Sequence, residues 1–234
     1  MAQETNDSQK IQTEHGLVAF FDILGFKSLL RANTLKESLA IIDNSFIKAL
    51  TETERIHKNL SRLKTFVISD SILVALPMEQ AQSAANEAYV YLFCSFCQFL
   101  MLYLFYEGLP IRGAIAVGEF HIRNENNKII FAGKPIVDAC EMANAIDLSA
   151  CVIVPASESN VLSQVTTDLF RIHATPRKAF PKSELYLLKY GVKDHPFARE
   201  KIIEMFNAHG KHLDQSSLSK VNNTIDFFGA MWRG

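Results

Sequence analysis

One aspartate inside an otherwise apolar run constrains the fold of this chain more than any other feature. Residues 17–24 read Leu-Val-Ala-Phe-Phe-Asp-Ile-Leu, and Gly25 ends the run. A short, nearly continuous apolar run is typical of a central strand that is buried on both faces. A carboxylate in such a strand is costly unless something pairs with it. The sequence therefore predicts a covered sheet and a partner for Asp22.

A second acid stands at a similar break. Residues 64–76 contain two apolar, strand-like halves around Ser69-Asp70-Ser71, which predicts a hairpin with Asp70 at its polar tip. If this hairpin neighbours the first strand, both acids emerge at one edge, where two carboxylates repel unless a cation lies between them. Mg²⁺ or Mn²⁺ suits such a pair and leaves room for phosphate oxygens. Taken alone, Asp70 at a hairpin tip is more often only a turn residue, and Asp22 has an alternative explanation as a paired core acid.

The backbone after Asp22 is a second candidate for binding phosphate. We expect Ile23 to Phe26 to present N–H groups at the start of a helix, a turn that binds anions well. The other expected elements form a mixed α+β domain with a mostly antiparallel sheet flanked by helices. They are a helix after the Thr34–Glu37 capping box with Leu35, Leu39, Ile42, Phe46 and Leu50 on its apolar face, a helix over 79–106, a strand over 111–120, a hairpin over 121–131, a helix over 136–145, a strand over 150–155 and a helix over 224–232.

Composition excludes some partners. The formal net charge is −1, with 24 basic and 25 acidic residues and no basic block, so a nucleic-acid partner is not expected. The four cysteines lie in apolar surroundings, and Cys94 and Cys97 have no second pair or histidine cluster. We therefore expect reduced thiols, no zinc, and a cytoplasmic protein.

Two segments bear on the domain organisation. Residues 88–106 are almost wholly apolar and long enough to span a bilayer, but Glu87 and Glu107 flank them. A core or subunit-interface helix is expected there, and no membrane span. Residues 1–14 are polar and predict a disordered lead-in. Residues 15–234 are then expected to form one domain with a C-terminal helical extension.

Five stretches resemble the catalytic domain of class III nucleotidyl cyclases. The stretch from Phe20 to Phe26 is similar to that family's first metal-binding motif, with an aromatic residue, Asp, Ile, Gly and Phe in order. The stretch around Asp70 resembles its second metal-binding hairpin. The likeness spans residues 17–155, and the remaining matches are Ile111 to Glu119, Phe131 to Ala143, and Val152 to Val154.

The resemblance implies a ferredoxin-like fold that works as a homodimer, with active sites at the subunit interface. Asp22 and Asp70 would each ligand two Mn²⁺ or Mg²⁺ ions, helped by the Ile23 carbonyl. Leu24, Gly25 and Phe26 would bind phosphate. In this family one ion lowers the pKa of the ribose 3′-hydroxyl, and the other holds the nucleoside triphosphate.

Several positions depart from the family pattern. Phe66 and Ile130 stand where purine cyclases carry polar base-reading residues, and neither side chain can form a hydrogen bond. Val137 and Glu141 replace the Asn and Arg that stabilise the transition state. Arg112 is a candidate catalytic cation in their place, or alternatively a surface strand arginine. Lys134, Lys178 and Lys189 are further candidates, or solvated surface lysines.

These departures resemble the pyrimidine cyclases of bacterial Pycsar antiphage systems, in which an aromatic residue tends to stand at the base-reading position. The resemblance implies conversion of UTP to cyclic UMP, with CTP as second choice, and a second messenger in antiphage defence. Three alternatives remain open. They are a purine cyclase with unusual base contacts, a catalytically dead nucleotide- or protein-binding module, and a purely structural domain.

Overall fold

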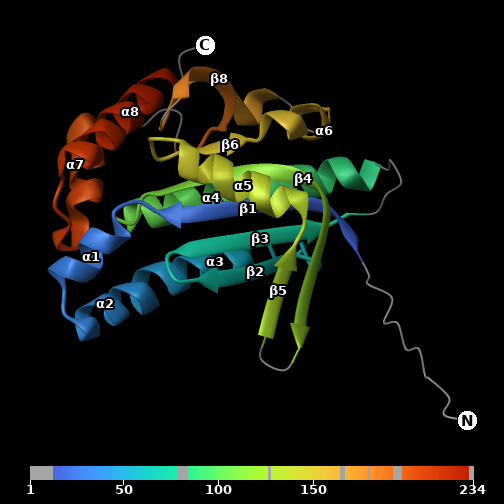
Figure 1. The fold of residues 1–234 in the computed structure, drawn as a ribbon, viewed down its shortest axis with the longest axis horizontal. Coiled ribbons are helices and arrows are strands. Elements are labelled where there is room, and N and C mark those ends of the chain that lie inside the picture. The colour runs from blue at the N-terminus through green and yellow to red at the C-terminus, as the bar shows by residue number, and fades with distance from the viewer. Residues whose placement is uncertain are drawn as a thin grey trace, which may run out of the picture.

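The central feature of the molecule is a mixed sheet. The structure is a computed structural model and describes residues 13–78, 84–125, 128–163, 167–178, 180–191 and 197–231. Within them the strand order is β2–β3–β1–β4–β6–β8–β7, with β5 paired to β4 (Figure 1). The only parallel pair there is β4–β6. The strands are β1 Glu14–Ile23, β2 Lys64–Ile68, β3 Ser71–Pro77, β4 Ile111–Glu125, β5 Lys128–Ala132, β6 Cys151–Ile153, β7 Phe170–Arg177 and β8 Phe180–Leu188.

The first four strands have the ferredoxin-like order 2-3-1-4, with helices between β1 and β2 and between β3 and β4. This confirms the predicted α+β class with a mostly antiparallel sheet. Strand β1 is central, as its apolar run predicts, because β3 and β4 both pair with it in antiparallel register. Its last residues place Asp22 opposite Ser71 on one side and opposite Arg112 on the other.

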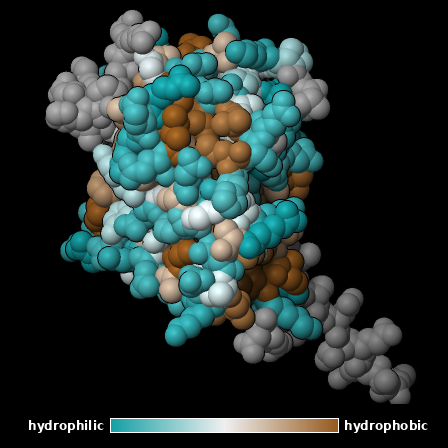
Figure 2. All heavy atoms as spheres, turned by 90° about the vertical axis from the view of Figure 1, so that its left-hand side faces the viewer, coloured by the Kyte–Doolittle hydropathy of each residue, from teal (hydrophilic) through white to brown (hydrophobic). Residues whose placement is uncertain are grey.

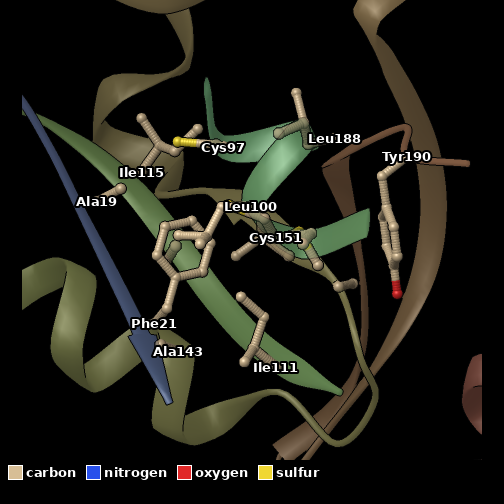
Figure 3. Close-up of a cluster of buried hydrophobic side chains, with 14 of the residues drawn as sticks. Ala19, Phe21, Cys97, Leu100, Ile111, Ile115, Ala143, Cys151, Leu188 and Tyr190 are labelled. Atoms are coloured by element: carbon tan, nitrogen blue, oxygen red, sulfur yellow. The ribbon is translucent and has the colours of Figure 1, made fainter. Parts of the chain in front are cut away.

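Helices cover both faces of this sheet. In Figure 1, α5 crosses in front of β1 and β4, whereas α3 and α4 lie behind the sheet. Phe21, Leu100 and Cys151 belong to one buried core formed by β1, α4, β4 and β6 (Figure 3). The helices are α1 Phe26–Ala32, α2 Leu35–Ile41, a π-helical segment Ile42–Ile47, α3 Lys48–Ile56, α4 Ala84–Tyr106, α5 Lys134–Ala145, α6 Glu158–Leu162, α7 Arg199–Asn207 and α8 Gln215–Met231.

Several predicted boundaries need correction. Strand β1 begins at Glu14, inside the expected lead-in, whose residues 1–12 lie outside the described part of the chain. The strand over 111–120 and the first half of the next hairpin are one strand, β4. The C-terminal helix starts nine residues earlier than predicted, at Gln215, and Trp232 lies outside the described residues.

The predicted apolar face of the helix after Thr34 is only half correct. The capping box is present, and Phe46 and Leu50 are buried, but Leu35 is 76% and Leu39 49% exposed. The π-helical segment Ile42–Ile47 explains the difference. A π turn contains more residues than an α turn, so the helical faces before and after it point in different directions.

Helix α4 is the expected long apolar helix. It is the one described helix long and apolar enough to cross a membrane, and half of that stretch is buried inside the protein. Cys94 and Cys97 lie on its buried side, and burial raises the pKa of the Cys94 thiol to about 12. The four cysteines are free, as expected.

Candidate active site

The end of β1 holds Asp22 in an ion pair. Arg112 of β4 donates two hydrogen bonds to Asp22 Oδ2, from Nη2 at 2.8 Å and from Nε at 3.0 Å. The side chain of Asp22 keeps 18% of its surface exposed. The predicted partner of this acid is therefore an arginine from the neighbouring strand. Both donors converge on one oxygen, so the contact anchors Oδ2 and balances the charge of the carboxylate.

Arg112 itself is fully engaged. Its Nη1 donates to the carbonyls of Asn144 at 3.1 Å and Ile146 at 3.2 Å, and its Nη2 also donates to Asn144 Oδ1 at 2.9 Å. With the two bonds to Asp22, these contacts account for all five guanidinium donors. Arg112 is 7% exposed, so it is not a surface strand arginine. A direct contact with phosphate would require it to give up one of these bonds.

Asp70 lies beside the same strand end, as the hairpin prediction requires. Its backbone carbonyl accepts a hydrogen bond from Ile23 N at 3.0 Å, and Ser69 before it has a positive φ of 58°. Asp22, Ile23 and Asp70 all line one cleft of about 730 Å³. The structure thus brings the two predicted metal-binding acids to a common space.

The turn after Asp22 differs in part from the prediction. Leu24 N donates to the Pro110 carbonyl at 2.9 Å, so this N–H already has an acceptor inside the protein. Gly25 adopts a left-handed conformation with a φ of 80°, and α1 begins at Phe26. The residues Leu24, Gly25 and Phe26 all line the cleft. Gly25 and Phe26 therefore keep the predicted place at a helix start.

The two predicted base-binding residues lie elsewhere. Phe66 of β2 is half-buried and packs edge-to-face on Phe131 of β5, with ring centroids 5.0 Å apart. Ile130 is 43% exposed and pairs with Arg123 across the β4–β5 hairpin. Neither residue lines the cleft that contains Asp22. Within one chain, the structure does not bring the predicted base pocket and the predicted metal site together.

The positions that replace the usual transition-state residues are also outside the cleft. Val137 and Glu141 lie on α5 and are exposed, Val137 by 53%. Lys134 pairs with Asp138 one turn along the same helix. Lys178 and Lys189 do not line the cleft either. Burial and then the positive charge of Arg112 lower the pKa of Lys178.

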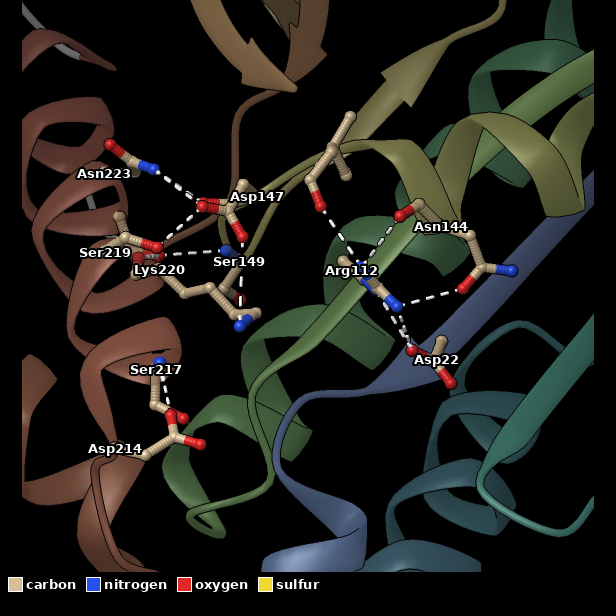
Figure 4. A network of polar contacts seen from close by, with 12 residues as sticks. Asp22, Arg112, Asn144, Asp147, Ser149, Asp214, Ser217, Ser219, Lys220 and Asn223 are labelled. Carbon is tan, nitrogen blue, oxygen red and sulfur yellow. Dashed lines mark hydrogen bonds and ion pairs between the residues drawn. The ribbon is translucent and has the colours of Figure 1, made fainter. Parts of the chain in front are cut away.

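Sequence reasoning missed the opposite wall of the cleft. This wall comes from the C-terminal segment and from α1, and nothing in their local sequence distinguishes them from ordinary surface residues. Figure 4 shows the Asp22–Arg112–Asn144 group on one side and residues of α8 on the other. The residues that line this wall are Lys27, Ser28, Arg31, Ala32, Phe206, Lys211, His212, Leu213, Asp214, Ser217 and Lys220.

The donor set of the cleft suits a hard divalent cation. Among the described residues no group of three or more His, Cys, Asp or Glu side chains gathers, so any ion here would depend on Asp22 and Asp70. Arg112 occupies Oδ2 of Asp22 but leaves Oδ1 without a hydrogen bond within the described chain. Carboxylate and carbonyl oxygens are the ligands that Mg²⁺ and Mn²⁺ prefer. The residues present therefore fit such an ion.

Comparisons with known proteins identify the fold. No protein-family model matches the sequence, and no curated protein does. Among solved structures, the adenylyl cyclase CyaB from P. aeruginosa matches with a TM-score of 0.52 and 18% identity, over 78% of this chain and 97% of its own. A double mutant of the guanylyl cyclase domain of the RhoGC fusion protein from the aquatic fungus Blastocladiella emersonii matches with a TM-score of 0.55 and 14% identity, over 77% and 98%. A bacterial light-regulated adenylyl cyclase gives a TM-score of 0.51 and 13% identity, over 76% and 91%. The chain therefore has the fold of class III cyclase domains, as the motifs predict.

Proposed function

We propose that this protein is a nucleotidyl cyclase, which converts a nucleoside triphosphate to a 3′,5′-cyclic nucleotide and pyrophosphate. One observation carries the proposal. Asp22 and Asp70 open on the same cleft, and they do so in a fold that the chain shares with adenylyl and guanylyl cyclase domains. A fold alone does not define a function, so the argument depends on this pair of acids.

Asp22, Asp70 and the Ile23 carbonyl would hold two Mn²⁺ or Mg²⁺ ions. When bound, these ions supply Lewis acidity that lowers the pKa of the ribose 3′-hydroxyl and stabilises the charge on leaving pyrophosphate. The 3′-oxygen gives its proton to solvent water and forms a bond to the α-phosphorus. The bond from that phosphorus to the β-bridging oxygen breaks, and pyrophosphate leaves with the electron pair. Arg112 serves this step indirectly, because it fixes the orientation of Asp22.

We propose UTP as the substrate, with CTP as second choice, and a cyclic pyrimidine nucleotide as a cytoplasmic second messenger in antiphage defence. Phe66 and Ile130 support a base other than a purine, because they replace polar base-reading residues with side chains that form no hydrogen bonds. Since both lie outside the cleft, the proposal requires a homodimer in which one chain adds its Phe66 to its partner's site. Exposed apolar side chains on β5 and α5, namely Ile129, Ile130 and Val137, favour such an interface.

Two other functions remain as alternatives. A purine cyclase would use base contacts different from those of its relatives. A catalytically inactive nucleotide-binding module is favoured by Val137 and Glu141, which cannot replace the Asn and Arg of active cyclases. Retention of both Asp22 and Asp70 argues for the enzyme, because a module without catalysis has no need for two acids in one cleft.

The proposal is tested by incubating the protein with each of the four ribonucleoside triphosphates and Mn²⁺, and identifying the products by mass. We expect cyclic UMP or cyclic CMP. A purine product would establish the first alternative. The absence of product from any triphosphate would contradict both the pyrimidine cyclase and the purine cyclase. Asp70→Asn is the informative variant, because the Asp70 side chain has no hydrogen bond within the described chain. It should remove activity without loss of stability, whereas Asp43→Asn is the matched control, because Asp43 is an exposed residue of the π-helical segment.

The base preference has its own test. Phe66→Lys introduces a donor at the base-reading position, and we expect the ratio of pyrimidine to purine products to fall. Val67→Lys is the matched control, because Val67 is 40% exposed on the same strand and points to the other face. Unchanged selectivity in Phe66→Lys would remove Phe66 from the base pocket.

A further inference from the structure

The cleft that contains Asp22 and Asp70 has two chemically different sides. The acids lie where β1 and the β2–β3 hairpin end. Across from them the wall is rich in basic side chains from α1 and from the C-terminal segment, namely Lys27, Arg31, Lys211, His212 and Lys220. Asp214 also lines this wall, and Lys220 pairs with Asp147. The lysine and arginine side chains of the wall that form no ion pair in the described chain are Lys27, Arg31 and Lys211. A cleft that combines these cations with Asp22 and Asp70 is suited to an elongated anion whose one end carries metal.

The C-terminal side of the cleft is fixed in place by contacts that reach across the sequence. His209 Nε2 lies 2.7 Å from the Glu107 carbonyl at the end of α4, and Asn33 Nδ2 donates to the His209 carbonyl at 2.7 Å. His212 N donates to Ser28 Oγ of α1 at 3.1 Å. These contacts hold the segment between α7 and α8 against α1 and α4. The basic wall is therefore part of the folded domain.

Lys211 is the most unusual residue of this wall. It is only 4% exposed, and its Nζ donates to the Gly108 carbonyl at 2.6 Å and to the Met205 carbonyl at 3.5 Å. No carboxylate of the described chain forms an ion pair with it. Its side chain runs beside Gly25, because a Cβ added to that glycine would lie 3.3 Å from Lys211 Cδ.

A buried ammonium group without a counter-ion is costly. Burial lowers the pKa of Lys211 to about 8, which reflects that cost. An anion bound in the cleft would offset it, since a charge-assisted hydrogen bond to phosphate is about twice as strong as a neutral one. The charge of Lys211 thus points to an anionic ligand that the protein itself does not supply.

Two further cations stand nearby on α1. Lys27 and Arg31 are exposed, four residues apart and hence on one face of the helix. Neither forms an ion pair within the described chain. The side of the molecule on which α1 and α7 lie is mostly hydrophilic, with separate apolar patches (Figure 2). Both side chains are therefore free to turn toward a ligand in the cleft.

We propose that Lys211, together with Lys27 and Arg31, binds the β- and γ-phosphates of the substrate triphosphate. The C-terminal extension of the same chain thereby supplies the phosphate cation that Arg112, Lys134, Lys178 and Lys189 do not. The identity of the ligand as a nucleoside triphosphate rests on the proposed function, whereas the binding of a polyphosphate rests on the charges of this wall alone.

The test separates these two statements by using inorganic tripolyphosphate, which cannot be cyclised. Its affinity for the full chain is measured by calorimetry with Mg²⁺ present. We compare Lys211→Met, the double variant Lys27→Gln/Arg31→Gln, and the control Lys36→Gln, an exposed lysine of α2 outside the cleft. We expect tripolyphosphate affinity to fall by about tenfold or more in the first two, as for loss of contacts to a charged group, and to stay unchanged in the control.

Each outcome decides one statement. Affinities within twofold of wild type in both cleft variants overturn the phosphate subsite, even if the protein makes a cyclic nucleotide. An absence of tripolyphosphate binding by the wild-type protein overturns it as well. A tenfold loss in a protein that cyclises no triphosphate supports the subsite and contradicts the proposed function. If Lys211→Met does not fold, the double variant decides, because its two residues are exposed.

Discussion

The two sides of the cleft handle charge in opposite ways. On the sheet side, Asp22 is neutralised by Arg112, and Asn144 and Ile146 accept the remaining guanidinium protons. On the C-terminal side, Lys211 is buried against carbonyl groups with no carboxylate of the described chain beside it. On the sheet side every guanidinium donor and the charge of Asp22 have partners within the protein, so this arrangement stabilises the fold and holds Asp22 in place. The second leaves a charge unmatched, which is what a binding site for an anion requires.

The largest effect on stability is expected when the ion pair between Asp22 and Arg112 is broken. Arg112→Met leaves Asp22 without its cation, and removing one partner of a buried ion pair costs about 3–5 kcal/mol. We expect a loss of about 3 kcal/mol in the free energy of unfolding, at the low end of that range because Asp22 keeps 18% of its side chain exposed. Urea unfolding measures it. We also expect cyclase activity to fall, since Asp22 loses its orientation.

A double-mutant cycle with Asp22→Asn separates the pair from its surroundings. The double variant should be more stable than the two single losses add up to, because neither charge then remains alone. Arg112→Lys should not restore activity, since a lysine lacks the planar fork that holds both Asp22 and Asn144. Additive losses would show that Arg112 does not hold Asp22.

The second prediction concerns Lys211 on the C-terminal side of the cleft, and it is tested by the pH dependence of the free energy of unfolding. The folded-state pKa of Lys211 is about 8, below the ordinary 10.5. Between these values the unfolded chain keeps a proton that the folded chain has released, so a rise in pH favours the folded state. The cost of the buried charge is fully present below pH 8. From pH 7 to pH 10 the wild type should gain roughly 2–3 kcal/mol in free energy of unfolding relative to Lys211→Met.

Urea unfolding of both proteins at the two pH values measures this difference. Lys36→Met is the control, because an exposed lysine has no such cost. If the free energy of unfolding rises equally with pH in the wild type and in Lys211→Met, the burial of the Lys211 charge does not destabilise the fold. Tripolyphosphate should cancel the gain, since a bound anion keeps Lys211 protonated.

The sequence predicts the features of this cleft that depend on local patterns, and it does not predict those that depend on contacts between distant residues. Asp22 in its apolar strand and Asp70 at its hairpin tip are local patterns that predict a common sheet edge, and both acids lie at that edge in the structure. The partner of Asp22 was not predictable, because Arg112 lies 90 residues away and Asn144 a further 32. The burial of Lys211 cannot be predicted from the sequence for a similar reason. Its burial results from contacts with Gly108, 103 residues earlier.

The third effect weakens the satisfied side without removing a charge. Asn144→Ala deletes the Oδ1 atom that accepts from Arg112 Nη2, but it leaves the backbone carbonyls of Asn144 and Ile146 in place. A hydrogen bond to a charged group contributes about 1.5 kcal/mol or more, so the free energy of unfolding should fall by about that amount. Asn144→Asp keeps an oxygen acceptor and should lose less. Equal losses in the two variants would show that the Oδ1 contact is not what matters.

The smallest effect on stability is expected at α1, and it is informative because it is small. Lys27→Gln/Arg31→Gln removes two exposed charges without ion partners in the described chain, so the free energy of unfolding should change by less than about 0.5 kcal/mol. A ligand that binds only the folded state raises its melting temperature, by an amount that grows with the logarithm of its affinity. Tripolyphosphate should therefore raise the melting temperature of the wild type more than that of the double variant. Equal rises would mean that the anion does not bind at Lys27 and Arg31. The two sides of the cleft would then differ in their contributions to stability and not in anion binding by these residues.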